Sequence, residues 1–439
     1  MKKLFALMLC AMLCLLGAAS AENVVVEPFP NDGQFEGEEL SIIVSADWMN
    51  DRYDPTIARF EETYGVTVDL QTIPADQYFD ILLSSLANGT CSDIFWIQSN
   101  PFAIKSMIVD PENLCIDFTG ADWQGVIPEA RMSACMSDGK LYGLQVWHNS
   151  PEYVFVYNKT LFEELGLSVP TNYAEFKDVC AKIAEKGITP WFVPGADGWQ
   201  HQLAFFQVGG VYEEATPGLF DALNENKATF ADNAKMLEVL AQFKELSDLG
   251  YLGEDWIGTD STNMINEYGD RTIAMALNNS SYVKMLQDEL DTTDEFGMFL
   301  IPLGDNTWFP TSPAGPTMFG YKGTTHPELV KAFFQFVCTP ESLQEILDNS
   351  PKYTNLHVNV DIDQHWLPEE EAFMETIDPA KMNCCVLQNG TKYTNDYWMQ
   401  FGADLVAYCQ GTMEANDVLK AMDGYRAEAA ATVGDANWN

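Results

Sequence analysis

Basic residues are scarce in this sequence of 439 residues, in which 23 lysines and arginines stand against 65 aspartates and glutamates. The formal net charge is −42, and removing Lys2 and Lys3 with the N-terminal segment lowers it by two, to −44. A negative field of this size repels phosphate backbones and anionic lipids, so nucleic acid and membrane surfaces are excluded as partners. The acidity is typical of a secreted protein kept soluble by its charge, and selection of a cationic ligand is the alternative.

The signatures of common catalytic sites are absent too. There is no GxSxG elbow, no HExxH zinc helix and no GxxxxGK[ST] phosphate loop, and the five histidines are scattered. The acidic stretch 361–371 could hold a divalent cation, but it lacks the glycine of a calcium loop and is interpreted as solvated. We therefore predict no catalytic residues, no metal and no cofactor. A secreted glycoside hydrolase is kept as an alternative, because 65 acids make carboxylate pairs uninformative.

Long hydrophobic runs are missing except near the N-terminus, where residues 4–16 are apolar. A lysine pair precedes this run and Ala19-Ser20-Ala21 follows it, which is the pattern of a secretory signal over residues 1–21. The run is shorter than the roughly 20 residues of a membrane span. Neither cysteine in the run follows the small residue of a lipoprotein signal. We predict a free secreted protein, periplasmic or extracellular, without a lipid anchor.

Cysteines after residue 21 number eight, and an even count in an exported chain permits disulfides. Cys180 and Cys338 fall on apolar helix faces and are expected as buried thiols. No CxxC or Cys–His spacing indicates zinc. The connectivity stays open, and the possible pairs are Cys115 with Cys135, and Cys384 or Cys385 with Cys409.

The remaining chain of about 418 residues is long enough for two or three domains with their own cores. Residues 22–37 contain proline, glycine and acids without periodicity and are predicted to be a tether. Strand and helix patterns then alternate, which favours an α/β fold with a parallel sheet covered by helices. The predicted elements are a strand at 40–46, a helix at 55–64, a strand at 66–73, a helix at 77–88 and a strand at 93–97.

Helices further along the chain have readable boundaries. Asn172 is a predicted N-cap with Glu175 three residues later. The apolar stripe that follows has helical spacing and consists of Phe176, Val179, Cys180 and Ile183. A second such unit starts at Thr325, and its stripe consists of Leu329, Val330, Phe333, Phe336 and Val337. Helical patterns at 396–408 and 414–431 end the chain.

Segments spread over most of the chain together resemble one known family. The most informative is 157–190, which reads as a strand end, a short helix, a proline turn, a capped helix and a new strand. The others are YGVTVDLQTIP (64–74), SDIFWIQSN (92–100), DGKLYGLQVW (138–147), YGDRTIAMALNNSSY (268–282), FGMFLIPLGD (296–305) and THPELVKAFFQFVCTPES (325–342). The chain resembles the family 1 extracellular solute-binding proteins of sugar ABC importers, the group that includes maltose-binding protein.

The resemblance implies a two-lobed periplasmic-binding-protein fold, type II-like, with crossing segments as a hinge and the ligand in a cleft between the lobes. The lobes are expected to close around the ligand and to be recognised by the membrane permease subunits of an ABC transporter. The implied ligand is a small carbohydrate, a mono- or oligosaccharide, and the protein is expected to be a monomer. The expected boundaries are 38–148 plus 303–339 for lobe one and 150–298 plus 342–432 for lobe two.

Carbohydrate sites combine aromatic faces with polar side chains that hold hydroxyl groups, and in α/β sheets they lie beyond the carboxyl ends of strands. The resemblance implies these ligand residues: Asp47, Trp48, Asn50, Trp96, Gln98, Ser99 and Asn100 from lobe one, Glu152 and Tyr153 from the hinge, and Trp199, Asn279, Ser281, Tyr282 and Trp398 from lobe two. Tyr282 stands where the family commonly has tryptophan, which weakens the case for a long oligosaccharide. Core packing is the competing interpretation of each tryptophan, above all of Trp96 on an apolar strand.

Two other binding roles stay open. A cationic ligand such as a polyamine would pair its ammonium groups with Asp47 and Glu152. The predicted loops are also rich in glutamine, asparagine and serine, which suit neutral hydroxyl groups better. A surface adhesin without a transporter is the remaining alternative.

Overall fold

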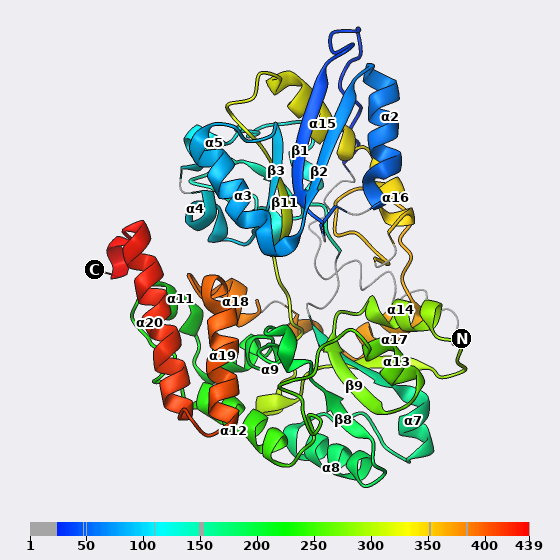
Figure 1. Ribbon diagram of the computed structural model, residues 1–439, viewed down its shortest axis with the longest axis vertical. Helices are drawn as coiled ribbons and strands as arrows, with labels where there is room; N and C mark the ends of the chain where they lie inside the picture. The colour runs from blue at the N-terminus through cyan, green and yellow to red at the C-terminus, as the bar shows by residue number, and fades with distance from the viewer. Residues whose placement is uncertain are drawn as a thin grey trace.

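Two α/β lobes, one above the other in Figure 1, make up the protein. The structure, a computed structural model, describes residues 24–46, 48–49, 51–108, 110–148, 153–350, 353–382 and 385–438. The predicted signal segment lies outside the described residues. Each lobe is built around its own sheet, so the predicted α/β, two-lobed fold is confirmed.

The upper lobe, lobe one, contains a five-stranded sheet with β2-β1-β3 parallel and β11 antiparallel to both β3 and β6. Its strands are β1 (Glu39–Ser45), β2 (Thr67–Ile73), β3 (Ile94–Ser99), β6 (Gly143–Leu144) and β11 (Gly315–Gly320). Its helices are α2 (Asp54–Tyr64), α3 (Ala75–Asn88), α4 (Ala103–Ile108), α5 (Pro111–Leu114), α15 (Pro327–Val337) and α16 (Pro340–Asp348). The predicted strands and helices between 40 and 97 are confirmed, with β3 running two residues further than predicted.

Both faces of this sheet are covered, because side chains that alternate along a strand enter different cores. On β3, Ile94 and Trp96 pack with α2 and α15, whereas Phe95 and Ile97 pack with α3 and α4. The first four residues of the central strand β3 are therefore buried, and Gln98 near its end is partly exposed.

The lower lobe, lobe two, contains a four-stranded sheet of order β10-β7-β9-β8, in which β7 is antiparallel to both neighbours and β8 is parallel to β9. Its strands are β7 (Val154–Asn158), β8 (Thr189–Phe192), β9 (Ile273–Asn278) and β10 (Phe296–Phe299). Its longer helices are α8 (Tyr173–Ala184), α12 (Ala234–Asp248), α14 (Tyr282–Glu289), α19 (Trp398–Cys409) and α20 (Ala415–Val433). None of the helices in the described ranges has the length and apolar composition needed to cross a membrane.

Helix α8 begins as the sequence predicts. The Asn172 side chain accepts a hydrogen bond from the Glu175 backbone N–H at 3.0 Å, which satisfies one of the unpaired donors of the first turn. The four residues of its predicted stripe are all buried. Burial of each apolar side chain contributes about 1.5–3 kcal/mol, so this face attaches the helix to lobe two.

The chain passes between the lobes at places other than those predicted. Leu303, assigned to lobe one from the sequence, packs in the core of lobe two. Leu343 and Ile346 of α16, assigned to lobe two, pack in the core of lobe one. The predicted boundaries at 303 and 342 are therefore wrong. An apolar stripe shows that a helix face is buried, but it does not show which lobe's core buries it.

The described part of the predicted tether, residues 24–37, also packs on lobe one. Val26 and Phe35 are buried in its core, and the Val24 N–H donates to the Asn359 carbonyl at 2.9 Å. Val24 and Phe29 pack against the same core. These apolar residues have no regular spacing within an acidic segment, which is why the sequence predicted a tether instead.

Six of the described cysteines are free thiols, namely Cys91, Cys115, Cys135, Cys180, Cys338 and Cys409. The possible Cys115–Cys135 bridge is therefore wrong, and so is the possible bridge from Cys409 to Cys384 or Cys385, because Cys409 is a free thiol. Cys384 lies outside the described residues. Cys180 and Cys338 are buried as predicted, and burial raises their pKa.

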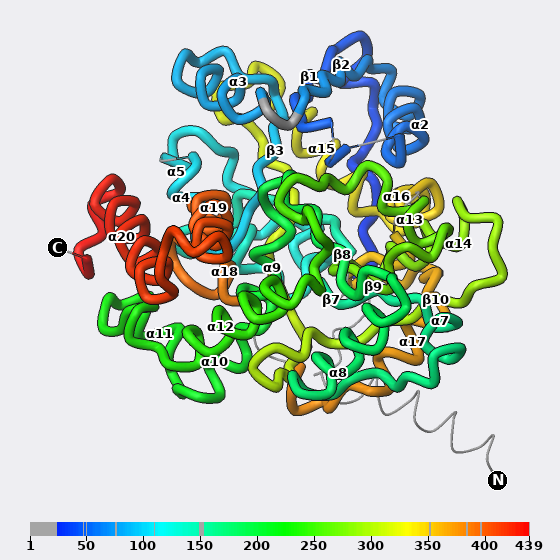
Figure 2. Tube along the Cα trace, turned by 60° about the horizontal axis from the view of Figure 1, so that its bottom comes forward, coloured from blue at the N-terminus to red at the C-terminus, as the bar shows by residue number. Residues whose placement is uncertain are grey.

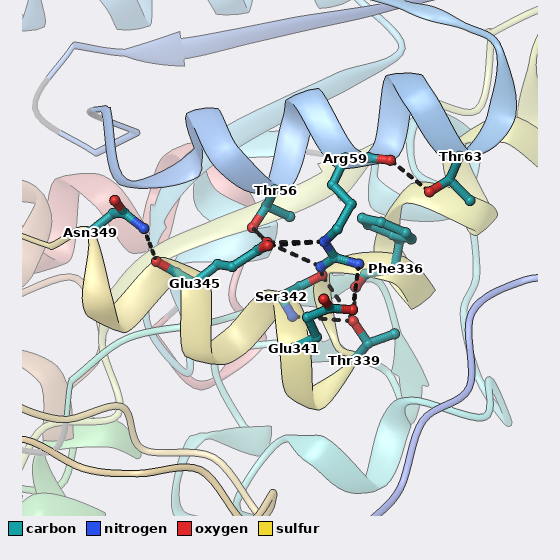
Figure 3. Close-up of polar contacts among 9 residues, drawn as sticks. All are labelled: Thr56, Arg59, Thr63, Phe336, Thr339, Glu341, Ser342, Glu345 and Asn349. Carbon is teal, nitrogen blue, oxygen red and sulfur yellow. Dashed lines mark hydrogen bonds and ion pairs between the residues drawn. The ribbon is translucent and has the colours of Figure 1, made fainter.

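Arg59 fixes α16 to α2 within lobe one (Figure 3). Its Nε donates to Glu345 at 3.0 Å, its Nη2 donates to the Ser342 hydroxyl at 2.6 Å, and its guanidinium lies 4.4 Å from the centre of the Phe336 ring. Glu341 forms a further ion pair with it at 3.1 Å. One partly buried cation thus joins α2 to both α15 and α16.

Replacing Arg59 with methionine is expected to lower the unfolding free energy by about 1–2 kcal/mol, because charge-assisted hydrogen bonds are lost while the apolar stem is kept. Urea denaturation measures the change. Lys331→Met, which removes an exposed i,i+3 pair with Glu328, is the control and is expected to cost less than about 0.5 kcal/mol. Equal losses in the two variants would contradict this account of α16.

Candidate functional site

The predicted ligand residues separate into three groups in the structure. Asp47, Asn50 and Glu152 lie outside the described residues. A second group is partly exposed and a third is buried. The partly exposed residues are Trp48, Gln98, Tyr153, Trp199, Asn279 and Trp398. Their role as ligand residues stays a prediction, and the structure shows where they lie.

Three of these side chains form a continuous aromatic surface on lobe two. The ring centres of Trp199 and Trp398 are 6.2 Å apart with an interplanar angle of 37°. The Tyr153 ring lies 5.8 Å from that of Trp199. All three pack with one side on the core of lobe two and are only partly buried. Three segments that are separate in the sequence thus form one aromatic surface on the core of lobe two.

A close approach of two backbones brings Trp199 to Trp398. The turn 195–201 contacts α19 at Gly402, whose carbonyl is 2.8 Å from the His201 Nε2 atom. A methyl group at residue 402 would lie 2.6 Å from the Gly198 carbonyl oxygen. Residue 402 must therefore be glycine for the turn to pack against α19. This packing brings the rings of Trp199 and Trp398 together.

On lobe one, Trp48 follows β1 directly and is held by two rings of α3. Its ring makes edge contacts with Tyr78 and Phe79, at centre distances of 5.3 and 5.8 Å. The Tyr78 hydroxyl donates to the Trp96 carbonyl at 2.7 Å, which fixes α3 on the sheet. Trp48 is thus packed against α3 and remains partly exposed.

A cavity of about 800 Å³ lies between the lobes. Its lobe-one wall comes from α3, α4 and α5, and its lobe-two wall comes from α20 and the 3-10 turn η6 (Asn395–Tyr397). Figures 1 and 2 both show the C-terminal end of α20 beside α4 and α5. Phe79, which contacts Trp48, and Tyr397, which precedes Trp398, both line this cavity. It therefore adjoins the aromatic residues of both lobes.

Tyr397, Tyr393 and Phe79 were missed by the sequence-based prediction. Tyr397 stacks on Tyr425 at 5.3 Å with an angle of 13°, which holds it at the cavity wall. Tyr397 directly precedes Trp398 in the sequence, and this adjacency is the signal that could have found it. Phe79 gives no such signal, because it meets Trp48 only in the folded protein.

Five predicted ligand residues are buried and make other contacts. Their side chains are not open to a ligand in this structure, which corrects the prediction for them. Trp96 is 1% exposed in the core of lobe one, because both faces of β3 are covered. The Ser99 hydroxyl donates to the Ala134 carbonyl, and Asn100 accepts hydrogen bonds from the backbone at the start of α4. Ser281 donates to Asn279 at 2.5 Å, and Tyr282 packs in an apolar cluster of lobe two.

A larger cavity, of about 990 Å³, lies on lobe two along β10 and helix α17 (Pro368–Met374). It contains none of the predicted ligand residues, and lobe-two residues alone line it. Its aromatic rings, such as Tyr157 and Phe299, are buried and present no free face. The interlobe cavity differs from it in having partly exposed rings from both lobes, Phe79, Tyr393 and Tyr397.

Metal ligation has no basis among the described residues, where no three His, Cys, Asp or Glu side chains converge. Within the acidic stretch 361–371, His365 forms an ion pair with Asp348 at 3.1 Å. Glu370 is instead buried and accepts hydrogen bonds from Ser280 and Thr354.

Two histidines lie near the first passage between the lobes. Burial and the nearby Arg131 guanidinium lower the pKa of His148 and of His357 to about 3 in each case. Arg131 Nε donates to His357 Nδ1 at 3.0 Å, and its Nη2 donates to the His148 carbonyl at 2.6 Å. Both imidazoles are therefore neutral at pH 7, and His357 acts as an acceptor.

Stability is expected to fall as the pH drops from 7 to 5. The unfolded chain binds protons at these histidines below pH 6.5 and the folded protein does not, so each can cost up to about 1.4 kcal/mol per pH unit. Urea denaturation at pH 7, 6 and 5 measures the slope. His357→Gln keeps an acceptor for Arg131 and is expected to give a shallower slope. Equal slopes in variant and wild type would contradict the lowered pKa.

Two α/β lobes joined by crossing segments, with aromatic side chains of both lobes around an interlobe cavity, define the class of two-lobed proteins that bind small solutes. Residues 46–344 match the family of bacterial extracellular solute-binding proteins, and the chain belongs to this family.

Relatives of known activity are more distant. The chain is 26% identical over 248 residues to a multiple sugar-binding protein of Streptococcus mutans, which covers 50% of this chain and 58% of that protein. It is 22% identical over 303 residues to an erythritol/L-threitol-binding protein of Mycolicibacterium smegmatis, covering 64% and 60%. The chain thus matches about three fifths of the length of these relatives.

Among solved structures, a sugar transporter protein of Bacillus licheniformis in complex with stachyose superimposes with a TM-score of 0.69 at 17% identity, covering 89% of this chain and all of that one. A family 1 extracellular solute-binding protein from Bifidobacterium longum subsp. infantis gives a TM-score of 0.68 at 19% identity, with 90% and 100% covered. At these identities the likeness shows the fold, and it confirms the two-lobed prediction.

Proposed function

We propose that this protein is the substrate-binding component of an ABC importer and captures a neutral carbohydrate or polyol between its lobes. The observation that carries the proposal is the aromatic surface of Tyr153, Trp199 and Trp398 on lobe two, with Trp48 on lobe one in contact with Phe79, which lines the interlobe cavity. Partly exposed aromatic rings on both lobes match the C–H-rich faces of sugar rings.

These side chains explain how the ligand is captured. In this proposal the rings stack on the sugar, and the amides of Gln98 and Asn279 hold its hydroxyl groups. Burial of ligand from both sides favours the closed arrangement of the lobes, because only that arrangement brings both sets of contacts together. The cavity volume of about 800 Å³ is within the usual range for small-ligand sites and suits a mono- or short oligosaccharide.

The known relatives support this ligand class by their own ligands. One is described as binding multiple sugars, another as binding erythritol and L-threitol, and a third is bound to stachyose. All of these are neutral polyhydroxy compounds. The family's other expected properties, export from the cell, delivery to membrane permease subunits and action as a monomer, belong to the same proposal.

A cationic ligand is the second candidate, and the described cavity wall gives it less support. Among the residues that line the cavity, Asp110 is the carboxylate, and its side chain caps α5 by accepting from Asn113. A polyamine needs several converging carboxylates. A hydrolase is disfavoured because the family consists of binding proteins.

Thermal-shift and tryptophan-fluorescence titrations with glucose, sucrose, raffinose, stachyose, erythritol and spermidine test the proposal. At least one of the neutral compounds is expected to bind and, at 100 times its Kd, to add about 2.7 kcal/mol of stability. Spermidine is expected to have no effect. Stabilisation by spermidine alone, or hydrolysis of a sugar, would overturn the proposal.

A further inference from the structure

Arg52 occupies an unusual position next to the predicted ligand loop. It lies on the 3-10 turn η1 (Asp51–Tyr53), four residues after Trp48, and is 1% exposed. Its Nη2 atom donates to the Trp48 carbonyl at 2.9 Å, whereas its Nε atom is buried without a hydrogen-bond partner. A buried guanidinium that is not fully hydrogen-bonded is costly, so other contacts must hold it there.

Aromatic rings from distant segments supply those contacts. The guanidinium lies 4.5 Å from the centre of the Tyr353 ring and 5.4 Å from that of Trp147. Tyr353 and Trp147 also contact one another at 5.0 Å. Trp147 immediately precedes the first passage of the chain between the lobes, and cation–π attraction is strongest at desolvated sites such as this. Arg52 therefore joins the Trp48 loop to two other segments of lobe one.

One of these segments reaches lobe two. Thr354, next to Tyr353, donates its hydroxyl to Glu370 of α17 at 3.0 Å. Glu370 is 2% exposed and also accepts from the Ser280 hydroxyl at 2.6 Å. Ser280 lies in the loop after β9, next to the partly exposed Asn279. A chain of buried contacts thus connects the Trp48 loop of lobe one with the predicted ligand loop of lobe two.

We infer that Arg52 is a positioning residue of the interlobe site. It fixes the Trp48 carbonyl and lies against Tyr353. The placement of Trp48, whose ring contacts Phe79 at the cavity wall, therefore depends on the segment that contacts lobe two. Arg52 itself is buried and does not touch the ligand. The inference rests on the proposed capture of a neutral carbohydrate or polyol between the lobes.

Arg59 offers a matched control in the same lobe. It also combines hydrogen bonds with a ring contact, at 4.4 Å from Phe336, but it joins α2 to α16 away from the cavity (Figure 3). Arg52→Met and Arg59→Met both remove a guanidinium and keep the stem. Both are expected to lower the melting temperature, so a stability loss alone does not distinguish them.

Titration of the six-compound panel above into wild type, Arg52→Met, Arg52→Lys and Arg59→Met tests the inference. For the compound that binds wild type most tightly, Arg52→Met is expected to raise the Kd at least tenfold, and Arg59→Met less than twofold. Arg52→Lys keeps a cation and a donor and is expected to recover part of the loss. Equal Kd changes in Arg52→Met and Arg59→Met would overturn the positioning role.

Hydrogen exchange without ligand separates this inference from the proposed function. Arg52→Met is expected to speed exchange at least fivefold in peptides that contain Trp48 and in peptides that contain Tyr353. Arg59→Met is expected to leave exchange in both sets of peptides unchanged. Faster exchange in only one of these regions would contradict the link between them. If no compound of the panel binds wild type, the proposed function fails, and the exchange result still decides whether Arg52 connects the two segments.

Discussion

Trp398→Ala is expected to weaken binding of the preferred sugar by about 10- to 100-fold, while the unfolding free energy of the empty protein changes by less than about 1 kcal/mol. The ring is partly exposed at the first position of α19 and rests on Trp199 at 6.2 Å. Truncating a tryptophan that stacks on a ligand costs about 1.4–2.8 kcal/mol of binding free energy, which corresponds to this range. Calorimetric titration gives the Kd, and urea denaturation gives the stability.

Two further variants sharpen this test. Trp398→Phe keeps a flat ring and is expected to retain most of the affinity. Trp308→Ala removes another half-buried tryptophan of lobe two, one whose Nε1 donates to Glu214 at 2.8 Å away from the interlobe cavity, and is expected to leave the Kd unchanged. A large stability loss in Trp398→Ala with an unchanged Kd would assign the ring to the core instead.

Trp96→Ala is expected to have the largest effect on stability, a loss of about 3–5 kcal/mol in unfolding free energy. The side chain is 1% exposed in the core of lobe one and meets the Tyr53 ring edge-on at 5.9 Å. Its removal leaves a cavity between β3 and the helices that cover it, which the surrounding rings cannot fill without moving. Urea denaturation measures the loss.

Trp366→Ala is the control for Trp96→Ala, because Trp366 is 38% exposed and its truncation is expected to cost less than about 1 kcal/mol. Trp96→Phe is expected to fall between the two. If Trp96→Ala kept its stability but lost sugar binding, the ring would belong to the ligand site, as the sequence resemblance implied.

Much of the fold was predictable because its signals are local. The alternation of strands and helices over residues 40–97 and the cap at Asn172 are set by residues close in sequence, and both are confirmed. The segments that resemble solute-binding proteins then fixed the two-lobed arrangement. The family match over residues 46–344 agrees with that inference.

The errors concern what lies next to a buried face. The stripe of α16 is equally apolar whichever lobe it joins, and its place in lobe one is decided by Arg59 and Glu345, far apart in sequence. Trp96 was ambiguous for the same reason, since alternation on β3 shows two faces but not that helices cover both. Residues 24–37 pack through four apolar side chains without regular spacing, Val24, Val26, Phe29 and Phe35, which no periodicity reveals.

The candidate site shows a similar division. Trp199 and Trp398 were predictable one at a time by resemblance, but their contact depends on the missing side chain of Gly402. Arg52 gave no signal, because a lone arginine after an apolar strand is ordinary in sequence. Its role depends on Tyr353 and Trp147, which lie beside it only in the folded protein.

Small-angle X-ray scattering during a titration with the sugar or polyol that binds tests the central claim most directly. If a carbohydrate is captured between the lobes, the radius of gyration is expected to fall as ligand is added and to level off at the stoichiometry of one ligand per chain. Trp398→Ala should need correspondingly more ligand for the same change. Saturating binding with no change in the radius of gyration would contradict capture between the lobes.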